Sequence, residues 1–460
     1  LQKRLVAAGD KVYATLGYRA SVTELDGCTG DALKTFAGTE GTNEIIVHDD
    51  VLIAAVLNAT QSGKYLERRG QQKVGTGAKV KAFDRNTGSL LWETDRFYGG
   101  AKWNYVIKKD ATPEHNTFEL DPALSIATDG KIVALSDDTN IVALDAKTGT
   151  QKWSVQRLDS FTDGAIRDRT VVGREAQRKH AAEQATRREA AKQGAIPEMW
   201  VGSIIVSDGV VLQGNASSLI AFDADTGKQL WEVPKGWIHH LWYTWQENYV
   251  IDGTVWTWGK TVSRELPNPR GRQKRVTLPE TLNGYDIKTG ELKKSIDTKS
   301  AFLVGHHHRC YRGKATERFV IASHRGVEMI DLDDGSLHVD RWVRATCHIG
   351  FIPANGLLYA PPHPCRCFLE EKLSYMNALA AESAAPESVL EPSAPQRLTR
   401  GKAYGYQGAP AKATDWPALR HDSKRSGSTP ANVDGALEIA WQKQIGRLPT
   451  APTAAEGLLF

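Results

Sequence analysis

The sequence has little net charge, no long apolar run and no Cys-x-x-Cys pair. The formal charge is +4 over 460 residues, and residues 165–195 alone hold eight Lys/Arg against four Asp/Glu. The rest is balanced, so a general nucleic-acid surface is not expected. No run of about 18 apolar residues occurs, so no membrane span is expected in this sequence. Without Cys-x-x-Cys, the common zinc-finger spacings and covalent c-type haem attachment are excluded.

Neither end carries a recognisable targeting signal. Leu1 opens into strand-like sequence without a basic-then-apolar leader, and residues 457–460 resemble the middle of a strand. We expect both ends to be cut from a longer chain, including an N-terminal part, so the missing leader decides nothing about compartment.

A short phrase, Asp-x-x-Thr-Gly, recurs along the chain. The residues are 41% hydrophobic and 24% charged, as in soluble globular proteins, and 460 residues exceed one ordinary domain unless it is a repeat array. Successive motif aspartates lie 58, 61, 78, 63 and 45 residues apart, which suits four-stranded blades with variable loops. The aspartates, the last in a degraded copy, are Asp26, Asp84, Asp145, Asp223, Asp286 and Asp331.

The residues of this repeated motif have identifiable structural roles. An alternating strand ends at the Asp, whose side chain can accept backbone N–H groups in a turn, and the Gly supplies the positive φ that reverses the chain. In three copies a Trp follows four residues after the Gly, where a large flat ring can stack neighbouring sheets. The blade-motif residues in these copies are Asp84, Gly88, Trp92, Asp145, Gly149, Trp153, Asp223, Gly227 and Trp231.

The pattern from Ala143 to Trp153 resembles the blade motif of pyrroloquinoline-quinone (PQQ) repeat propellers. That family includes quinoprotein alcohol dehydrogenases and outer-membrane assembly lipoproteins that share the fold without the cofactor. The resemblance implies an all-β propeller of seven or eight four-stranded blades over residues 1–380, located in the periplasm, at the cell envelope or outside the cell. It says little about activity, because the motif residues hold blades together.

Two interruptions and a change of pattern divide the chain. Residues 165–195 are rich in Ala, Glu, Arg, Lys and Gln, which predicts an inserted helix, either a solvated one or a docking element. Residues 381–414 are predicted to be a linker. Residues 415–460 resemble the opening of another repeat unit, which indicates a second, truncated propeller, with closure of the first ring as the alternative.

Histidines and cysteines concentrate between residues 305 and 367. Residues two apart in an extended segment share a face, so three short pieces could bring thiols and imidazoles together. Mixed sulfur and nitrogen ligands favour Zn or Cu, while disulfides between the pieces and unpaired buried thiols remain alternatives. The candidate ligands are His306, His308, Cys310, Cys347, His348, His363, Cys365 and Cys367.

Cations in the same region suggest an anion-binding mouth, or alternatively rim charges paired with local acids. The candidate ligand-binding residues are Arg309, Arg312, His324, Arg325 and Arg344.

Aromatic residues gather between residues 237 and 258, including the i, i+2 pair Trp256 and Trp258. Such a patch could stack a sugar or a quinone, or simply pack between blades.

Three functions remain open. The first is a binding or scaffold module for a small molecule, polysaccharide or protein at a propeller face. The second is a metal-dependent oxidoreductase or lyase using the His/Cys/Arg pieces. The third, a PQQ dehydrogenase, needs an ion held beneath the quinone, a base and a Trp floor, and no residues here can be assigned to those roles.

Overall fold

A computed structural model gives the fold. It describes residues 2–17, 19–59, 74–95, 97, 103–106, 117–120, 124–137, 140–156, 203–214, 218–236, 247–267, 272–303, 313–322, 326–346, 349–362, 373, 375–381, 405, 408–444 and 452–460. The expected helix at 165–195 lies outside these ranges.

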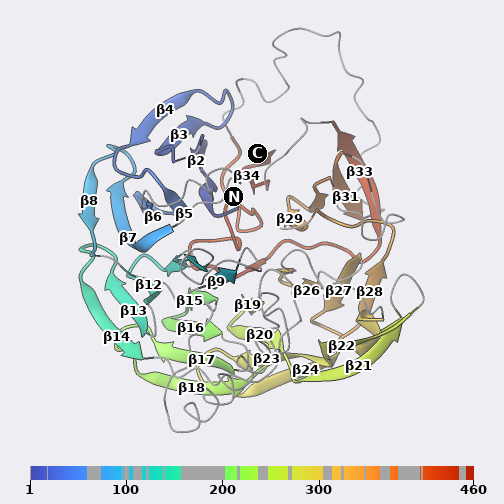
Figure 1. The fold of residues 1–460 in the computed structure, drawn as a ribbon. Coiled ribbons are helices and arrows are strands. Elements are labelled where there is room, and N and C mark those ends of the chain that lie inside the picture. The colour runs from blue at the N-terminus through green and yellow to red at the C-terminus, as the bar shows by residue number, and fades with distance from the viewer. Residues whose placement is uncertain are drawn as a thin grey trace.

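The described strands form a ring of seven blades, each with four antiparallel strands running from the centre to the rim (Figure 1). This confirms the propeller and its blade number.

The first three blades follow the chain order. Blade 1 is preceded by the short helix η1 (Gln2–Arg4) and consists of β1 (Leu5–Ala8), β2 (Lys11–Thr15), β3 (Val22–Asp26) and β4 (Ala32–Phe36). Blade 2 consists of β5 (Thr42–His48), β6 (Val51–Ala59), β7 (Val74–Asp84) and β8 (Leu90–Glu93). Blade 3 consists of β11 (Ile126–Thr128), β12 (Ile132–Asp137), β13 (Asn140–Asp145) and β14 (Gln151–Gln156).

Blades 4 and 5 continue the ring. Blade 4 consists of β15 (Ile204–Ser207), β16 (Val210–Gly214), β17 (Ser218–Asp223) and β18 (Gln229–Pro234). Blade 5 consists of β19 (Asn248–Ile251), β20 (Thr254–Trp258), β23 (Thr281–Asp286) and β24 (Leu292–Asp297), and the short helix η2 (Lys299–Ala301) follows it.

Blades 6 and 7 each include a strand from the C-terminal region. Blade 6 consists of β25 (Lys314–Thr316), β26 (Phe319–Ala322), β27 (Val327–Asp331) and β28 (Leu337–Asp340), with β32 (Ser428–Thr429) added in parallel to β25. Blade 7 consists of β29 (Ile352–Ala354), β30 (Leu357–Ala360), β31 (Met376–Ala381) and β33 (Leu437–Lys443).

Three two-stranded hairpins lie outside the seven blades. They are β9 (Trp103–Val106) with β10 (Thr117–Leu120), β21 (Thr261–Pro267) with β22 (Gln273–Pro279), and β34 (Ala454–Ala455) with β35 (Leu458–Leu459).

The pairing of β33 differs from the expected start of a second propeller. Its residues are the outermost strand of blade 7, in register with β31 from Met376↔Lys443 to Ala381↔Leu437. Part of the expected linker also joins the ring, because Ala409 N donates to Glu456 O at 3.3 Å. Residues 437–443 therefore belong to blade 7 of this ring.

Each motif turn is built as its residues predict. In blade 3 the Asp145 carboxylate accepts from Thr148 N at 2.9 Å and Lys147 N at 3.0 Å, and Gly149 takes a φ of +71°. These bonds favour the charged form of the Asp, led by the one from Thr148, so the pKa of Asp145 is lowered. The motif aspartates are thus committed to closing turns.

The tryptophans join one blade to the next. Trp153 of blade 3 donates its indole N–H to the carbonyl of Ala224 in the motif turn of blade 4 at 2.9 Å. Its ring also covers the next motif glycine: a Cβ on Gly227 would lie 2.7 Å from the ring. The other two equivalent bonds are Trp92 to Ala146 at 3.0 Å and Trp231 to Ile287 at 2.9 Å. We call the side chain four residues after a motif glycine the clamp residue.

Two blades use lysine as the clamp residue. Lys34 of blade 1 donates to the carbonyls of Arg85 and Asn86 at 2.7 and 2.6 Å. Lys294 of blade 5 donates to those of Leu332 and Asp333 at 2.7 and 2.6 Å. An ammonium group thus takes the place of the indole N–H, and the alkyl stem of Lys34 covers Gly88, whose Cβ would lie 2.9 Å from it.

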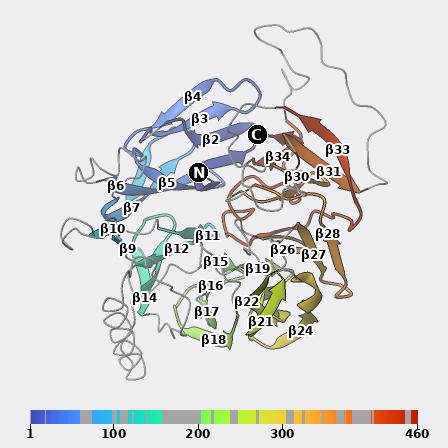
Figure 2. The same cartoon turned by 45° about the vertical axis from the view of Figure 1, so that its right-hand side comes forward.

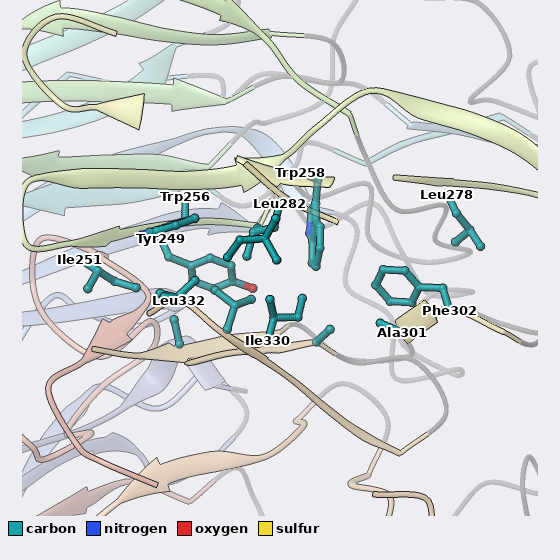
Figure 3. Packing of buried hydrophobic residues seen from close by; sticks show 14 of the residues in the cluster. Tyr249, Ile251, Trp256, Trp258, Leu278, Leu282, Ala301, Phe302, Ile330 and Leu332 are labelled. Atoms are coloured by element: carbon teal, nitrogen blue, oxygen red, sulfur yellow. The ribbon is translucent and has the colours of Figure 1, made fainter. Parts of the chain in front are cut away.

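Apolar side chains fill the space between blades. Figure 3 shows the cluster between blades 5 and 6, where Trp256 and Trp258 pack with Tyr249, Leu282 and Ile330. Trp258 also meets Phe302 edge-on at 5.7 Å between ring centroids. Both tryptophans are buried, as inter-blade packing requires and a sugar-stacking platform does not.

We expect Trp153→Ala to lower the free energy of unfolding by about 3–5 kcal/mol, because it removes a buried ring and its hydrogen bond. We expect Trp153→Lys to lower the free energy of unfolding by only about 1–2 kcal/mol, because lysine can act as a clamp residue, as it does in blades 1 and 5. Urea unfolding measures both, with Leu91→Ala, at a half-exposed rim position, as a near-neutral control. Equal losses for the two Trp153 variants would contradict the clamp.

Candidate functional site

The centre of the ring is crossed by one segment, residues 415–429, which we call the central strap (Figure 1). Its backbone carbonyls accept N–H groups from the innermost strands of five blades. The pairs are Ala7 with Pro417 at 2.7 Å, Thr128 with Ser423 at 3.0 Å, Val206 with Lys424 at 3.0 Å, Val250 with Ser426 at 3.1 Å, and Ala315 with Gly427 at 3.1 Å. The strap therefore satisfies inner-edge donors that would otherwise face the ring axis.

Arg425 ties the strap to blade 2. Its side chain is 1% exposed, and its guanidinium lies 2.9 Å from the carboxylate of Glu44, which is itself buried. The remaining guanidinium N–H groups donate to the carbonyls of Ile45, Ile126 and Leu419 at 3.1, 3.3 and 2.8 Å. Lys3 approaches the second oxygen of Glu44 at 2.7 Å. A buried ion pair together with three hydrogen bonds to backbone carbonyls fixes the strap at one place.

Asp422, His421 and Ser426 of the strap contain the residue types of a nucleophilic triad. Ser426 donates directly to Asp422 at 2.9 Å, and His421 Nδ1 lies 3.4 Å from Ser426 Oγ and 3.6 Å from Asp422. Because the carboxylate bonds the serine rather than orienting the far side of the imidazole, the group closes a turn and lacks the relay of a Ser-His-Asp site.

A second polar cluster is buried where blades 4, 5 and 6 meet the strap. Lys235, 6% exposed, donates to Asn248 Oδ1 at 3.1 Å, and Asn248 Oδ1 also accepts from Thr257 at 2.7 Å. Glu247 accepts from Gly313 N at 2.6 Å and from the Trp258 indole at 3.3 Å.

The environment of Lys235 favours its neutral form. Burial lowers its pKa to about 7, Glu247 opposes the shift, and the nearby Arg420 adds to it. An amine that titrates near neutrality is the most chemically distinctive group in the part of the chain that the structure describes, and it could bind an anion or exchange a proton. A purely structural role for the buried Lys235 is equally consistent with its lowered pKa.

Three described residues at or near this cluster, Gly236, Glu247 and Gly313, adjoin in sequence the two segments that carried much of the predicted chemistry. The aromatic segment 237–246 joins the described chain at Gly236 and Glu247, and the segment 304–312 joins it at Gly313. The hydrogen bond between Glu247 and Gly313 brings these attachment points together.

Most of the predicted site residues lie outside the described ranges. These are the metal candidates His306, His308, Cys310, Cys347, His348, His363, Cys365 and Cys367, and the ligand candidates Arg309, Arg312, His324 and Arg325. Arg344 is described and is buried next to the core residues Val343 and Ala345. Sequence reasoning missed Arg425 and Lys235. The only feature of the sequence that pointed to them is that each is a basic residue next to residues that are otherwise typical of the repeat.

The described residues offer neither a metal-binding cluster nor a membrane-spanning helix. No group of three or more His, Cys, Asp or Glu side chains in these ranges is placed to hold a metal ion. No helix in them is long and apolar enough to cross a membrane.

The seven-bladed ring, its motif turns and its clamp residues define a β-propeller built from PQQ-type repeats. Residues 73–237 match the model of the family described as outer membrane protein assembly factor BamB.

The chain is similar to several solved structures at low sequence identity. BamB from Moraxella catarrhalis is 13% identical, covering 78% of this chain and 94% of that chain, with a TM-score of 0.37. The computationally designed Ika8 protein is 12% identical, covering 78% and 92%, with a TM-score of 0.38. The quinohemoprotein alcohol dehydrogenase from Comamonas testosteroni is 15% identical, covering 83% and 53%, with a TM-score of 0.34. No curated protein matches the chain.

We expect Arg425→Met to lower the free energy of unfolding by about 3–5 kcal/mol, because it leaves the buried Glu44 carboxylate without its main partner. The double variant Arg425→Met/Glu44→Gln recovers part of that loss. Urea unfolding measures the two single variants and the double variant, and a double variant with the full sum of the single losses would argue against the pair.

Lys235 should also make stability depend on pH. Its pKa is about 7 in the folded protein and ~10.4 when unfolded, so between these values the unfolded chain binds more protons and stability rises with pH. The full rise is about 5 kcal/mol, and Lys235→Met removes it. The test compares urea unfolding midpoints at pH 6.5 and pH 9.5, for the unaltered protein and for Lys235→Met. An unchanged pH dependence in the variant would show that Lys235 is charged in the fold.

Proposed function

We propose that this chain is a binding or scaffold module of the cell envelope that engages a protein partner at a propeller face, rather than an enzyme with a ligand on the ring axis. The observation that carries the proposal is the central strap. Its carbonyls already accept N–H groups from the innermost strands of five blades, so the chain's own backbone occupies the middle of the ring. A partner protein would therefore contact the faces and the rim of the propeller.

The chemistry that recurs from blade to blade supports the same function. The aspartates of the motif turns accept local N–H groups, and the tryptophans donate to the next blade. These residues hold a rigid ring and leave variable loops to make contacts, as is usual for binding proteins built on propellers. The match of residues 73–237 to a family described as an outer-membrane assembly factor supports both a protein partner and an envelope location.

Fractionation of the source cells, followed by crosslinking, tests the proposal. We expect the protein in the envelope or periplasmic fraction, crosslinked to a defined protein partner. A parallel titration with PQQ and Ca²⁺, followed by absorbance, is expected to show no saturable change at micromolar cofactor.

Recovery only from the cytosol would overturn the envelope location. Saturable PQQ binding that is altered by Lys235→Met would favour a quinone enzyme. The Lys152→Ala variant, which changes an exposed rim ion pair with Asp225, is the control for non-specific effects in both assays.

A further inference from the structure

Blade 5 carries the hairpin β21–β22 between its second strand, β20, and its third, β23 (Figures 1 and 2). The hairpin has seven ladder pairs, from Thr261↔Pro279 to Pro267↔Gln273. A hairpin of two strands is marginally stable in water by itself, so this one depends on support from the blade.

One face of the hairpin is anchored in the core between blades 5 and 6. Leu266 and Leu278 are buried in the same cluster as Phe302, and Figure 3 shows Leu278 near the Phe302 ring. Arg264, two residues before Leu266 on β21, donates to the carbonyl of Lys299 in η2 at 3.2 Å. The hairpin is therefore a fixed arm of blade 5.

Two prolines fix which backbone groups of the hairpin point outward. In an antiparallel ladder, pairs that exchange both backbone hydrogen bonds alternate with pairs that exchange none. Pro267 and Pro279 have no N–H, so their pairs, with Gln273 and Thr261, must be of the second kind. At each end of the ladder, the backbone groups of the paired residues therefore point away from the partner strand.

The alternation then defines the outer edge of β22. Thr277 and Arg275 lie two and four residues before Pro279, so their pairs are of the same kind. The N–H and C=O groups of Gln273, Arg275 and Thr277 therefore point away from β21. In the part of the chain that the structure describes, the sheet has only these two strands, so nothing is paired with this edge. Such an edge can accept another strand.

The hairpin region is strongly basic. Residues 260–280 contain six Lys/Arg and two Glu, an excess equal to the net charge of +4 of the whole chain. Lys260 and Arg272 are exposed. β22 carries Lys274 and Arg275 without an acid, whereas β21 carries one cation and one acid. Because like charges across a strand pair are destabilising, the edge of β22 disfavours a basic strand, including a second copy of itself, and favours an acidic one.

We propose that the outer edge of β22 binds an extended, acidic segment of a partner protein as an added strand. The backbone of that segment pairs with Gln273, Arg275 and Thr277, and its carboxylates offset the cations of the hairpin. Two independent observations carry the inference: the open edge that register and prolines define, and the basic charge of the same strand. The inference rests on the proposed binding function and names the chemistry of the partner.

A short fluorescent peptide of alternating valine and glutamate provides the probe. We expect its anisotropy to rise saturably when it is titrated with the whole chain. Raising the salt to about 0.5 M should weaken binding at least about fivefold, because attractions between exposed charges are screened.

Two further peptides separate strand addition from simple charge attraction. A peptide of alternating valine and lysine should not bind. A valine–glutamate peptide with proline in place of two valines keeps the charge but cannot form a complete ladder, so it should bind at least about tenfold more weakly.

Two matched variants of the protein locate the edge. Thr277 and Ser263 lie opposite each other, so Thr277→Pro and Ser263→Pro each remove one outward N–H and leave the bonds between β21 and β22 intact, as Pro267 and Pro279 do. We expect Thr277→Pro to lose at least about tenfold in affinity for the valine–glutamate peptide, because it blocks the edge of β22. Ser263→Pro changes the edge of β21 and should keep the affinity.

A charge reversal tests the same site without altering the ladder. Arg272 is exposed and precedes β22, and we expect Arg272→Glu to weaken binding of the valine–glutamate peptide at least about threefold. Lys228→Glu, at an exposed position in the motif turn of blade 4, is the matched control and should leave binding unchanged. This pair decides the question even if Thr277→Pro lowers the melting temperature.

Absence of saturable binding, equal binding of the peptides with and without proline, or equal effects of the two matched variants in either pair would overturn the inference. Light scattering tests a second occupant: a dimer lost in Thr277→Pro but kept in Ser263→Pro would mean that a second copy fills the edge, and would also overturn it. Failure here is separable from failure of the proposed function, since a chain found in the envelope with a crosslinked partner keeps that function without this site.

Discussion

The ring depends on a side chain from each of blades 1 to 5 that reaches the motif turn of the next blade. In blades 2, 3 and 4 it is a Trp whose indole donates to a turn carbonyl while its ring covers a glycine. The glycine serves twice, because its positive φ reverses the chain and its missing side chain admits the ring. Turn geometry and blade stacking are therefore one constraint, and a change at either partner affects both.

The central strap adds a second level of organisation. Clamp residues join neighbouring blades only, whereas the strap contacts the innermost strands of blades that are not neighbours. The buried Arg425–Glu44 pair fixes its position from the side of blade 2. Nearest-neighbour contacts alone would make the ring a chain of repeats that could open locally, and the strap couples the blades into one unit.

The sequence predicted the propeller, the motif turns and the role of the tryptophans, because these follow from residues within about ten positions of one another. It did not predict that Lys34 and Lys294 act in the place of Trp, since lysine is most often a solvated surface residue. It placed residues 415–460 at the start of a new unit because their local pattern resembles one. Which sheet they join is decided by contacts such as that of Arg425 with Ile45, 380 residues away, and no local pattern encodes those contacts.

The difference between local and long-range contacts also explains why some residues of the candidate site could be predicted and others could not. Trp256 and Trp258 were placed correctly on one strand, and their burial between blades 5 and 6 then follows from the ring. Lys235 gave no signal because its lowered pKa depends on burial and on the nearby Arg420 of the strap, which only the closed ring brings about. The His/Cys pieces remain a prediction, because they lie outside the described residues.

The position of the strap has a consequence for biosynthesis. Residues 415–429 emerge from the ribosome after the first six blades and three strands of the seventh, yet they contact the inner strands of blades made hundreds of residues earlier. Until then the nascent ring has a hollow centre lined by edge strands with open N–H groups, a state exposed to aberrant pairing. Because contacts of such large sequence separation form slowly, we expect docking of the strap to be a late step in folding.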